Sequence, residues 1–129
     1  MPVAGAVRNP HVTEQKVEFR TEQIAAYARA SGDMNPIHLD ERFAKSVGLP
    51  GVIAHGMLQM SIAAVVAGKA AGGAQRLTRL SCRFAGMVEP GDVVTFTAEE
   101  AGPGKLQIRA VNQHGDVILT KGMAEFDAA

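Results

Sequence analysis

Residues 57–71 read MLQMSIAAVVAGKAA, a stretch rich in helix-favouring residues and apolar on nearly every side. Gly56 precedes this stretch and Gly72-Gly73 follow it, so we expect a helix over residues 56–71 that ends at the paired glycines. A helix that is apolar on most of its surface is stable only when other parts of the protein cover it. The rest of the chain therefore has to supply the covering layer.

Four candidate strands follow this helix. They cover residues 76–88, 92–100, 105–112 and 116–126, with turn sequences at Glu89-Pro90-Gly91-Asp92, Gly102-Pro103-Gly104 and His114-Gly115-Asp116. Such short connections favour antiparallel pairing, because a parallel crossover needs about a dozen or more residues. The sequence thus predicts an α+β domain in which one antiparallel sheet curls around one long apolar helix.

The part of the chain before the long helix supplies shorter elements. Partly alternating apolar residues predict a strand over residues 12–19, and helical spacing predicts a short amphipathic helix over residues 22–31. A second helical piece is expected over residues 39–48. Between the two helices, turn-forming residues gather at positions 32–36, so the chain has to bend there.

Length and composition limit the class of protein. The chain has 129 residues, 13 Lys and Arg against 13 Asp and Glu, no Trp and one cysteine, which fits one globular domain without an internal disulfide. A reducing cytoplasmic location is expected, and scattered basic residues argue against a nucleic-acid partner. No secretory signal is seen, and the apolar stretch at residues 57–71 is too short to cross a membrane. We expect residues 1–11 to form a loose N-terminal arm and residues 12–129 the domain.

Reactive side chains concentrate between the two short helices. Asp33 and His38 lie five positions apart across the bend that Gly32 and Pro36 force. A carboxylate beside an imidazole is a common acid–base pair. On spacing alone, Asp33 can also be an ordinary turn residue bonded to nearby amides, and His38 a surface residue. This alternative is the commoner arrangement.

Other chemistries have weaker support in the sequence. Asp33, His38 and His55 lack the ligand spacing of a zinc site, so no metal is expected. Ser61 lacks the turn of a hydrolase nucleophile, and Cys82 falls inside a candidate strand. The glycines do not form a phosphate-binding loop, so no nucleotide cofactor is expected either.

The start of the long helix is a second candidate site. The first amide groups of a helix have no partner within it, and the helix dipole is positive there. Gly56 has no side chain to block an approaching oxygen, so a carbonyl that becomes an enolate could be stabilised at its N–H. The plainer alternative is that Gly56 only permits close packing.

Three runs of sequence together resemble the MaoC-like (R)-specific enoyl-CoA hydratases and (3R)-hydroxyacyl-thioester dehydratases. They are SGDMNPIHLD at residues 31–40, IAHGML at residues 53–58 and VEPGD at residues 88–92. The resemblance extends over roughly residues 15–125 and implies the hot-dog fold for the domain. One departure is that the stretch before Val12 lacks the Gly-Asp-containing lead-in that many members carry.

The resemblance also implies roles for individual residues. Asp33 and His38 would hold and activate the reacting water, and the backbone N–H of Gly56 would bind the thioester oxygen. Asn35 and His55 would belong to the substrate-binding group, with Asn35 shaping the loop.

The implied enzyme is a hydro-lyase of fatty acid metabolism without a cofactor. It would interconvert trans-2-enoyl and (3R)-hydroxyacyl thioesters carried on CoA or acyl carrier protein. Two alternatives stay open: a thioester-binding partner subunit of a heterodimeric dehydratase, and a thioesterase on the same fold. Because one curled sheet leaves exposed edge strands, a dimer of identical or related chains is expected.

Overall fold

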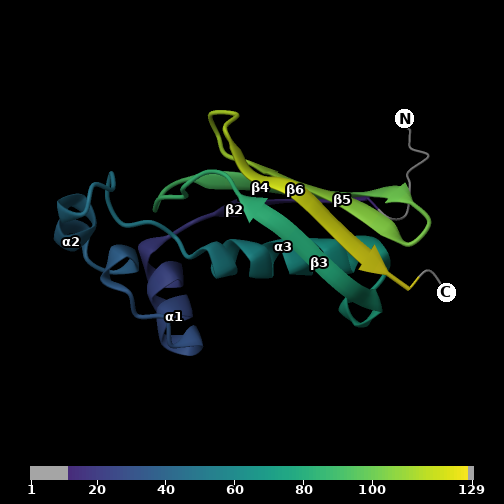
Figure 1. Cartoon of the computed structure of the whole chain (residues 1–129), viewed down its shortest axis with the longest axis horizontal. Coiled ribbons are helices and arrows are strands. Elements are labelled where there is room, and N and C mark those ends of the chain that lie inside the picture. Colours follow the sequence, from purple (N-terminus) through teal and green to yellow (C-terminus); the bar gives the residue numbers. More distant parts are fainter. Residues whose placement is uncertain (1–11, 128–129) are drawn as a thin grey trace.

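The computed structural model describes residues 12–127 as one antiparallel sheet with a long helix against it (Figure 1). The strands are β2 (Val12–Glu18), β3 (Leu77–Phe84), β4 (Val93–Gly102), β5 (Lys105–Val111) and β6 (Val117–Phe126). The helices are α1 (Thr21–Ser31), α2 (Glu41–Ser46) and α3 (Gly56–Ala71), with short 3-10 turns η1 (Pro36–His38) and η2 (Ala74–Arg76). The N-terminal arm predicted for residues 1–11 lies outside the described residues.

The sheet has the strand order β2-β4-β5-β6-β3, and every neighbouring pair is antiparallel. In Figure 1 the teal helix α3 runs along one face of this sheet, beneath the strands. This arrangement is the hot-dog fold, and it confirms the prediction of an antiparallel sheet around a long apolar helix. The pairing expected across the turn at residues 89–92 is wrong, because β3 lies at the sheet edge beside β6 and not beside β4.

The core lies between α3 and the inner face of the sheet. Alternate residues of β4 and β5 are buried, because successive side chains of a strand point to opposite faces. Alanines along α3 face them, and Ala63, Ala67 and Ala70 are fully buried. Small side chains let the helix axis lie close to the sheet, and the larger Phe96 and Leu106 from the strands fill the remaining space.

One stripe of α3 stays uncovered in this chain. Met57, Ser61, Val65 and Lys69 follow one another at intervals of four residues and are all exposed. Met57 and Val65 keep 57% and 52% of their surface accessible, so the sheet curls around only part of the helix. The expectation that this helix is covered on every side is therefore too strong for the single chain.

Most elements match their expected ranges to within two residues at each end, but β3 and α2 are shorter by several residues. β3 ends at Phe84 rather than running to residue 88, because the amides of Ala85 and Gly86 both donate to the carbonyl oxygen of Ile118. This shared acceptor ends the regular ladder, and the chain turns out of the sheet. The helical piece predicted for residues 39–48 is shorter, since Asp40 caps α2 by accepting a hydrogen bond from the Phe43 amide.

The short elements α1, η1 and α2 stand beyond the end of the sheet at which α3 begins (Figure 1). Backbone hydrogen bonds fix this region: the amide of Ile53 donates to Ile37, and the amide of Ala54 donates to Val88. The start of α3 is thereby held between η1 and the β3–β4 connection. Among residues 12–127, no helix combines the length and apolar character that a membrane crossing requires.

Candidate active site

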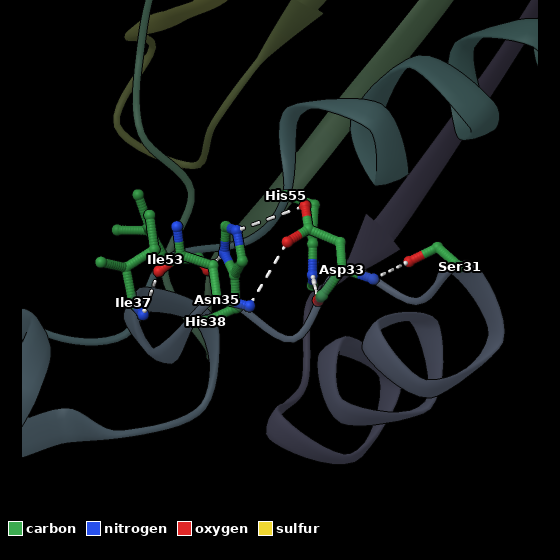
Figure 2. A network of polar contacts seen from close by, with 7 residues as sticks. All are labelled: Ser31, Asp33, Asn35, Ile37, His38, Ile53 and His55. Carbon is green, nitrogen blue, oxygen red and sulfur yellow. Dashed lines mark hydrogen bonds and ion pairs between the residues drawn. The ribbon is translucent and has the colours of Figure 1, made fainter.

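The loop after α1 is shaped by short side-chain contacts (Figure 2). Gly32 ends α1 with φ of 81°, a left-handed conformation that glycine adopts without strain. The amide of Asp33 then donates to Ser31 Oγ at 3.2 Å, and the amide of Asn35 donates to Asp33 Oδ1 at 3.3 Å. Asp33 thus acts as a turn residue through one oxygen, and its other oxygen, Oδ2, points towards His38 (Figure 2).

Asn35 holds the next turn of the same loop. Its Oδ1 accepts a hydrogen bond from the amide of Ile37 at 3.1 Å, at the start of η1. Pro36 follows at the first position of η1, where a proline is well tolerated. Asn35 is exposed and is absent from the cavity wall described below, so in this structure it shapes the loop rather than lining the cavity.

His38 is buried, with only 8% of its surface accessible, so it is not a surface histidine. Its Nδ1–H donates to the carbonyl oxygen of Ile53 at 2.8 Å. Because Nδ1 carries the proton, the neutral ring has a free lone pair on Nε2. That nitrogen lies 3.9 Å from Asp33 Oδ2, a gap too long for a direct hydrogen bond and one that a water molecule can bridge.

His55 lies behind His38. The two imidazole rings stack with centroids 3.6 Å apart, and the ring of Tyr27 meets His55 edge-on at 4.9 Å. His55 Nε2–H donates to the backbone carbonyl of Asp33 at 3.1 Å and so ties the loop to the start of α3 (Figure 2). Only 2% of His55 is accessible, and its ring does not line the cavity. It therefore supports the site from behind.

Gly56 is the first residue of α3, and its N–H lies in the turn whose amides have no acceptor within the helix. A Cβ atom at this position would meet the ring of Phe84 at 3.0 Å. A larger residue would therefore crowd the space beside this N–H. The positive end of the helix dipole adds to the attraction that an oxygen would feel here.

A cavity of about 480 Å³ opens beside His38 and Gly56, within the range of small-molecule sites. Most of its wall is apolar, and the β3–β4 connection supplies part of it. The lining residues are Ile37, His38, Ile53, Ala54, Gly56, Gln59, Phe84, Ala85, Gly86 and Met87. The side chain of Asp33 is 53% exposed and lies outside this wall, beside His38.

Gln59, Phe84 and the β3–β4 connection are among the parts of the cavity wall that sequence reasoning missed. Gln59 is the one amide side chain in the apolar run of residues 57–71, which was a signal that it has a polar role. Phe84 and Met87 gave no such signal, because residues 76–88 resemble a continuous strand.

The same cluster offers the groups that a metal ion would need. Asp33, His38 and His55 each place one possible ligand atom within 4.8 Å of the others. However, His38 Nδ1 and His55 Nε2 already donate to backbone carbonyls, and the two rings are stacked rather than converging. This geometry fits an acid–base pair better than a tetrahedral zinc site. The absence of a metal stays a prediction.

Neither alternative nucleophile is placed for attack in this cavity. Ser61 Oγ donates to the carbonyl of Met57 on the exposed side of α3. Cys82 packs against the core, and burial raises the pKa of its thiol, which lowers the fraction of reactive thiolate.

Comparison with known proteins identifies the family. The profile of the family described as "MaoC like domain" matches residues 3–123. Fatty acid synthase subunit beta of Saccharomyces cerevisiae is 35% identical over an alignment of 137 positions, gaps included, that covers 93% of this chain. 3-hydroxyacyl-thioester dehydratase Y of Mycobacterium tuberculosis is 33% identical over 84% of the chain. The chain spans 7% and 40% of the lengths of these two relatives.

Solved structures agree over a similar span. The (R)-hydratase from A. caviae, described as involved in PHA biosynthesis, superposes with a TM-score of 0.78 at 29% identity. That comparison covers 94% of this chain and 96% of the hydratase. R-hydratase PhaJ1 from Pseudomonas aeruginosa gives a TM-score of 0.78 at 28% identity, over 88% of this chain and 77% of that one.

Proposed function

The chain belongs to the MaoC-like domain family, and we propose that it is a hydro-lyase that interconverts trans-2-enoyl and (3R)-hydroxyacyl thioesters. One observation carries this proposal. His38 Nε2 and Asp33 Oδ2 lie 3.9 Å apart next to a cavity whose wall also contains Gly56, at the start of α3. An acid–base pair and a free backbone N–H thus approach the same apolar space.

The acid–base pair would act on water. A water molecule between Asp33 Oδ2 and His38 Nε2 would donate one hydrogen bond to each, which strengthens its oxygen as a nucleophile. In hydration, one O–H bond of this water breaks, its oxygen bonds to C3 of the enoyl group, and a proton is delivered to C2. Positioned proton transfer of this kind accelerates a reaction by about 10²–10⁴-fold. The two side chains are assigned together, as a coupled pair.

Gly56 would act on the thioester. The double bond accepts a nucleophile only when the carbonyl draws electrons away from C3, which builds negative charge on the carbonyl oxygen. The N–H of Gly56 and the dipole of α3 would stabilise that charge, by about 3 kcal/mol for one such donor. In this proposal the reverse dehydration uses the same groups, because each step is reversible.

Support for the R configuration comes from the relatives. The A. caviae and Pseudomonas aeruginosa proteins are both named as R-hydratases and are 29% and 28% identical to this chain. We extend that stereochemistry to this chain as part of the proposal. The thioester carrier would be CoA or acyl carrier protein.

The proposal includes a dimer, because β2 and β3 form the two edges of the sheet. Edge strands leave backbone groups free to pair with another chain. Phe84 on β3 and Met123 on β6 also remain about half exposed, at 47% and 46%. The partner would be a second copy of this chain or a related chain.

A direct assay separates hydration from the two alternatives. The purified protein would be mixed with crotonyl-CoA, and loss of the enoyl absorbance would be followed beside release of free thiol. We expect absorbance to fall without thiol release and chiral analysis to give the (3R)-hydroxy product. Release of thiol would indicate a thioesterase instead. No reaction with either CoA or acyl-carrier-protein substrates would contradict the proposal and favour a non-catalytic partner subunit.

A further inference from the structure

Gln59 is a buried amide with an unsatisfied oxygen. Only 3% of its surface is accessible, and its Oε1 has no hydrogen-bond partner among the described residues. Buried polar atoms nearly always have a partner, since leaving one unpaired destabilises the protein. The position is on the first turn of α3, three residues after Gly56. An apolar residue at position 59 would avoid the destabilisation that an unpaired buried oxygen causes. The presence of an amide there therefore suggests that it has a functional role.

The amide belongs to the wall of the cavity beside His38. Among the side chains that line this cavity, those of His38 and Gln59 are the two with polar groups, and the others are apolar or glycine. His38 already has its hydrogen-bond donor role filled by Ile53. The proposed mechanism assigns the free His38 Nε2 to the reacting water. Gln59 Oε1 is then the other side-chain acceptor of the wall without a partner, and a bound molecule would supply one.

The reacting water is not that partner. In the proposed mechanism its two hydrogens are directed to Asp33 Oδ2 and His38 Nε2, so none is left for a third acceptor. Gln59 also lies further along the helix than the amide expected to bind the carbonyl oxygen. Three residues of an α-helix advance about 4.5 Å along its axis. In the proposed function we take the acyl chain to run from that carbonyl along α3, so that the Gln59 amide meets it beyond the carbonyl group.

We propose that Gln59 is a specificity-determining residue that favours enoyl thioesters with a hydroxyl group on the acyl chain, at C4 or C5. The inference rests on the proposed function, because it takes the cavity to be the thioester site. The hydroxyl donates its hydrogen to Gln59 Oε1, while an unsubstituted alkyl chain leaves that oxygen unpaired. A site built to bond a hydroxyl discriminates strongly against a substrate that lacks one, because its buried polar group then has no partner.

The test measures binding, so that it does not depend on turnover. Calorimetry would compare trans-hex-2-enoyl-CoA with its 4-hydroxy and 5-hydroxy derivatives on the His38→Ala protein, which should not consume them. We expect at least one hydroxy derivative to bind at least about tenfold more tightly than the plain chain. Replacing Gln59 by Leu in the same protein should reduce this ratio to near one. Gln59→Met provides a second apolar replacement if the Leu variant fails to fold.

Met87→Leu is the matched control, because it conserves volume at another position of the same wall. It should alter the affinities for all three thioesters alike and keep their ratio. A ratio near one before any change at Gln59, a ratio that survives Gln59→Leu, or no binding of any thioester would overturn the inference. Hydration of crotonyl-CoA by the unaltered protein is measured separately, so a failure of the proposed function is seen on its own.

Discussion

The hydrogen bond from His38 Nδ1 to the carbonyl oxygen of Ile53 decides which nitrogen of the ring is available for chemistry. With Nδ1 protonated, Nε2 is the acceptor that faces Asp33 Oδ2. Asp33 in turn uses Oδ1 to accept the amide of Asn35, which leaves Oδ2 free. The bond that looks like ordinary turn geometry therefore also orients the carboxylate. The turn role and the acid–base role of these residues are compatible, because they use different atoms: Asp33 Oδ1 and His38 Nδ1 hold the structure, while Asp33 Oδ2 and His38 Nε2 are left for chemistry.

Removing either member of the pair should stop the reaction without unfolding the protein. We expect Asp33→Asn and His38→Ala each to lower kcat for enoyl hydration by at least about 10²-fold. The measurement is the steady-state rate, with circular dichroism to verify folding. His114→Ala is a suitable control, because His114 is exposed on the β5–β6 hairpin, far along the chain from both residues. A folded variant with a near-normal rate would remove that residue from the mechanism.

At the scale of elements, the start of α3 brings the site together. His55 links it to the loop after α1, the Ala54 amide links it to the β3–β4 connection, and Gly56 lies in the wall of the cavity. The sequence predicted this helix end well, since glycine and composition mark it clearly. It did not predict that β3 stops at Phe84, because the reason is a contact with Ile118, a residue distant in sequence.

Gly56→Ala tests the role assigned to the helix end. The added Cβ would meet the Phe84 ring at 3.0 Å, so either the ring or the start of α3 has to shift, which would disturb the geometry around the N–H. We expect kcat/KM to fall by about tenfold or more, since the oxyanion contact contributes through its geometry. The loss should be partly recovered when Phe84→Leu is added. Ser61→Ala, on the exposed side of the same helix, controls for the change in helix propensity. An unchanged kcat/KM in Gly56→Ala would argue against the contact.

Gly32→Ala tests the turn that leads into the loop. Gly32 has φ of 81°, and no atom of the described residues outside its immediate neighbours lies within 4 Å of the place that a Cβ would take, so the effect would come from backbone strain alone. We expect the free energy of unfolding to fall by about 1–2 kcal/mol, measured by chemical denaturation. Gly115→Ala is a close match, because Gly115 has φ of 84° and equally open surroundings on the β5–β6 hairpin.

The two glycine variants should differ in activity. Both should lose similar stability, but only Gly32→Ala should lower kcat, because Gly32 directs the chain to Asp33. Equal kcat values in the two variants would show that the turn does not control the position of the carboxylate.

At the scale of the whole molecule, sequence periodicity was enough to predict an antiparallel sheet and the central helix, but not the strand order, because β3 pairs with β6 and not with β4, the next strand along the chain. These features depend on local patterns and on short connections such as Gly102-Pro103-Gly104. The cavity depends on contacts between segments that are distant in sequence, namely Ile37 with Ile53 and Ala54 with Val88. Local sequence patterns do not predict such contacts, so the cavity could not be predicted. Gln59 shows the limit clearly, because its position in the wall appears only after the chain has folded.

The edge strands lead to a prediction about assembly. Sedimentation velocity at micromolar concentration should show a species of twice the chain mass, because β2 and β3 are the two edges of the sheet that the described residues form. A single species at the monomer mass would contradict the dimer, and mixing with a related chain would then test for a heterodimer.

Hydration of crotonyl-CoA in D₂O, with the product examined by NMR, is the most direct test of the proposed reaction. If Asp33 and His38 deliver both the hydroxyl and the proton from one side, the product is the (3R)-hydroxy thioester with one deuterium at C2, on the same face as the new hydroxyl. The His38→Ala protein should form this product at least about 10²-fold more slowly. A (3S) product, or deuterium on both faces of C2, would contradict addition by this pair. Failure of the folded protein to hydrate enoyl thioesters on either CoA or acyl carrier protein would contradict the central claim itself.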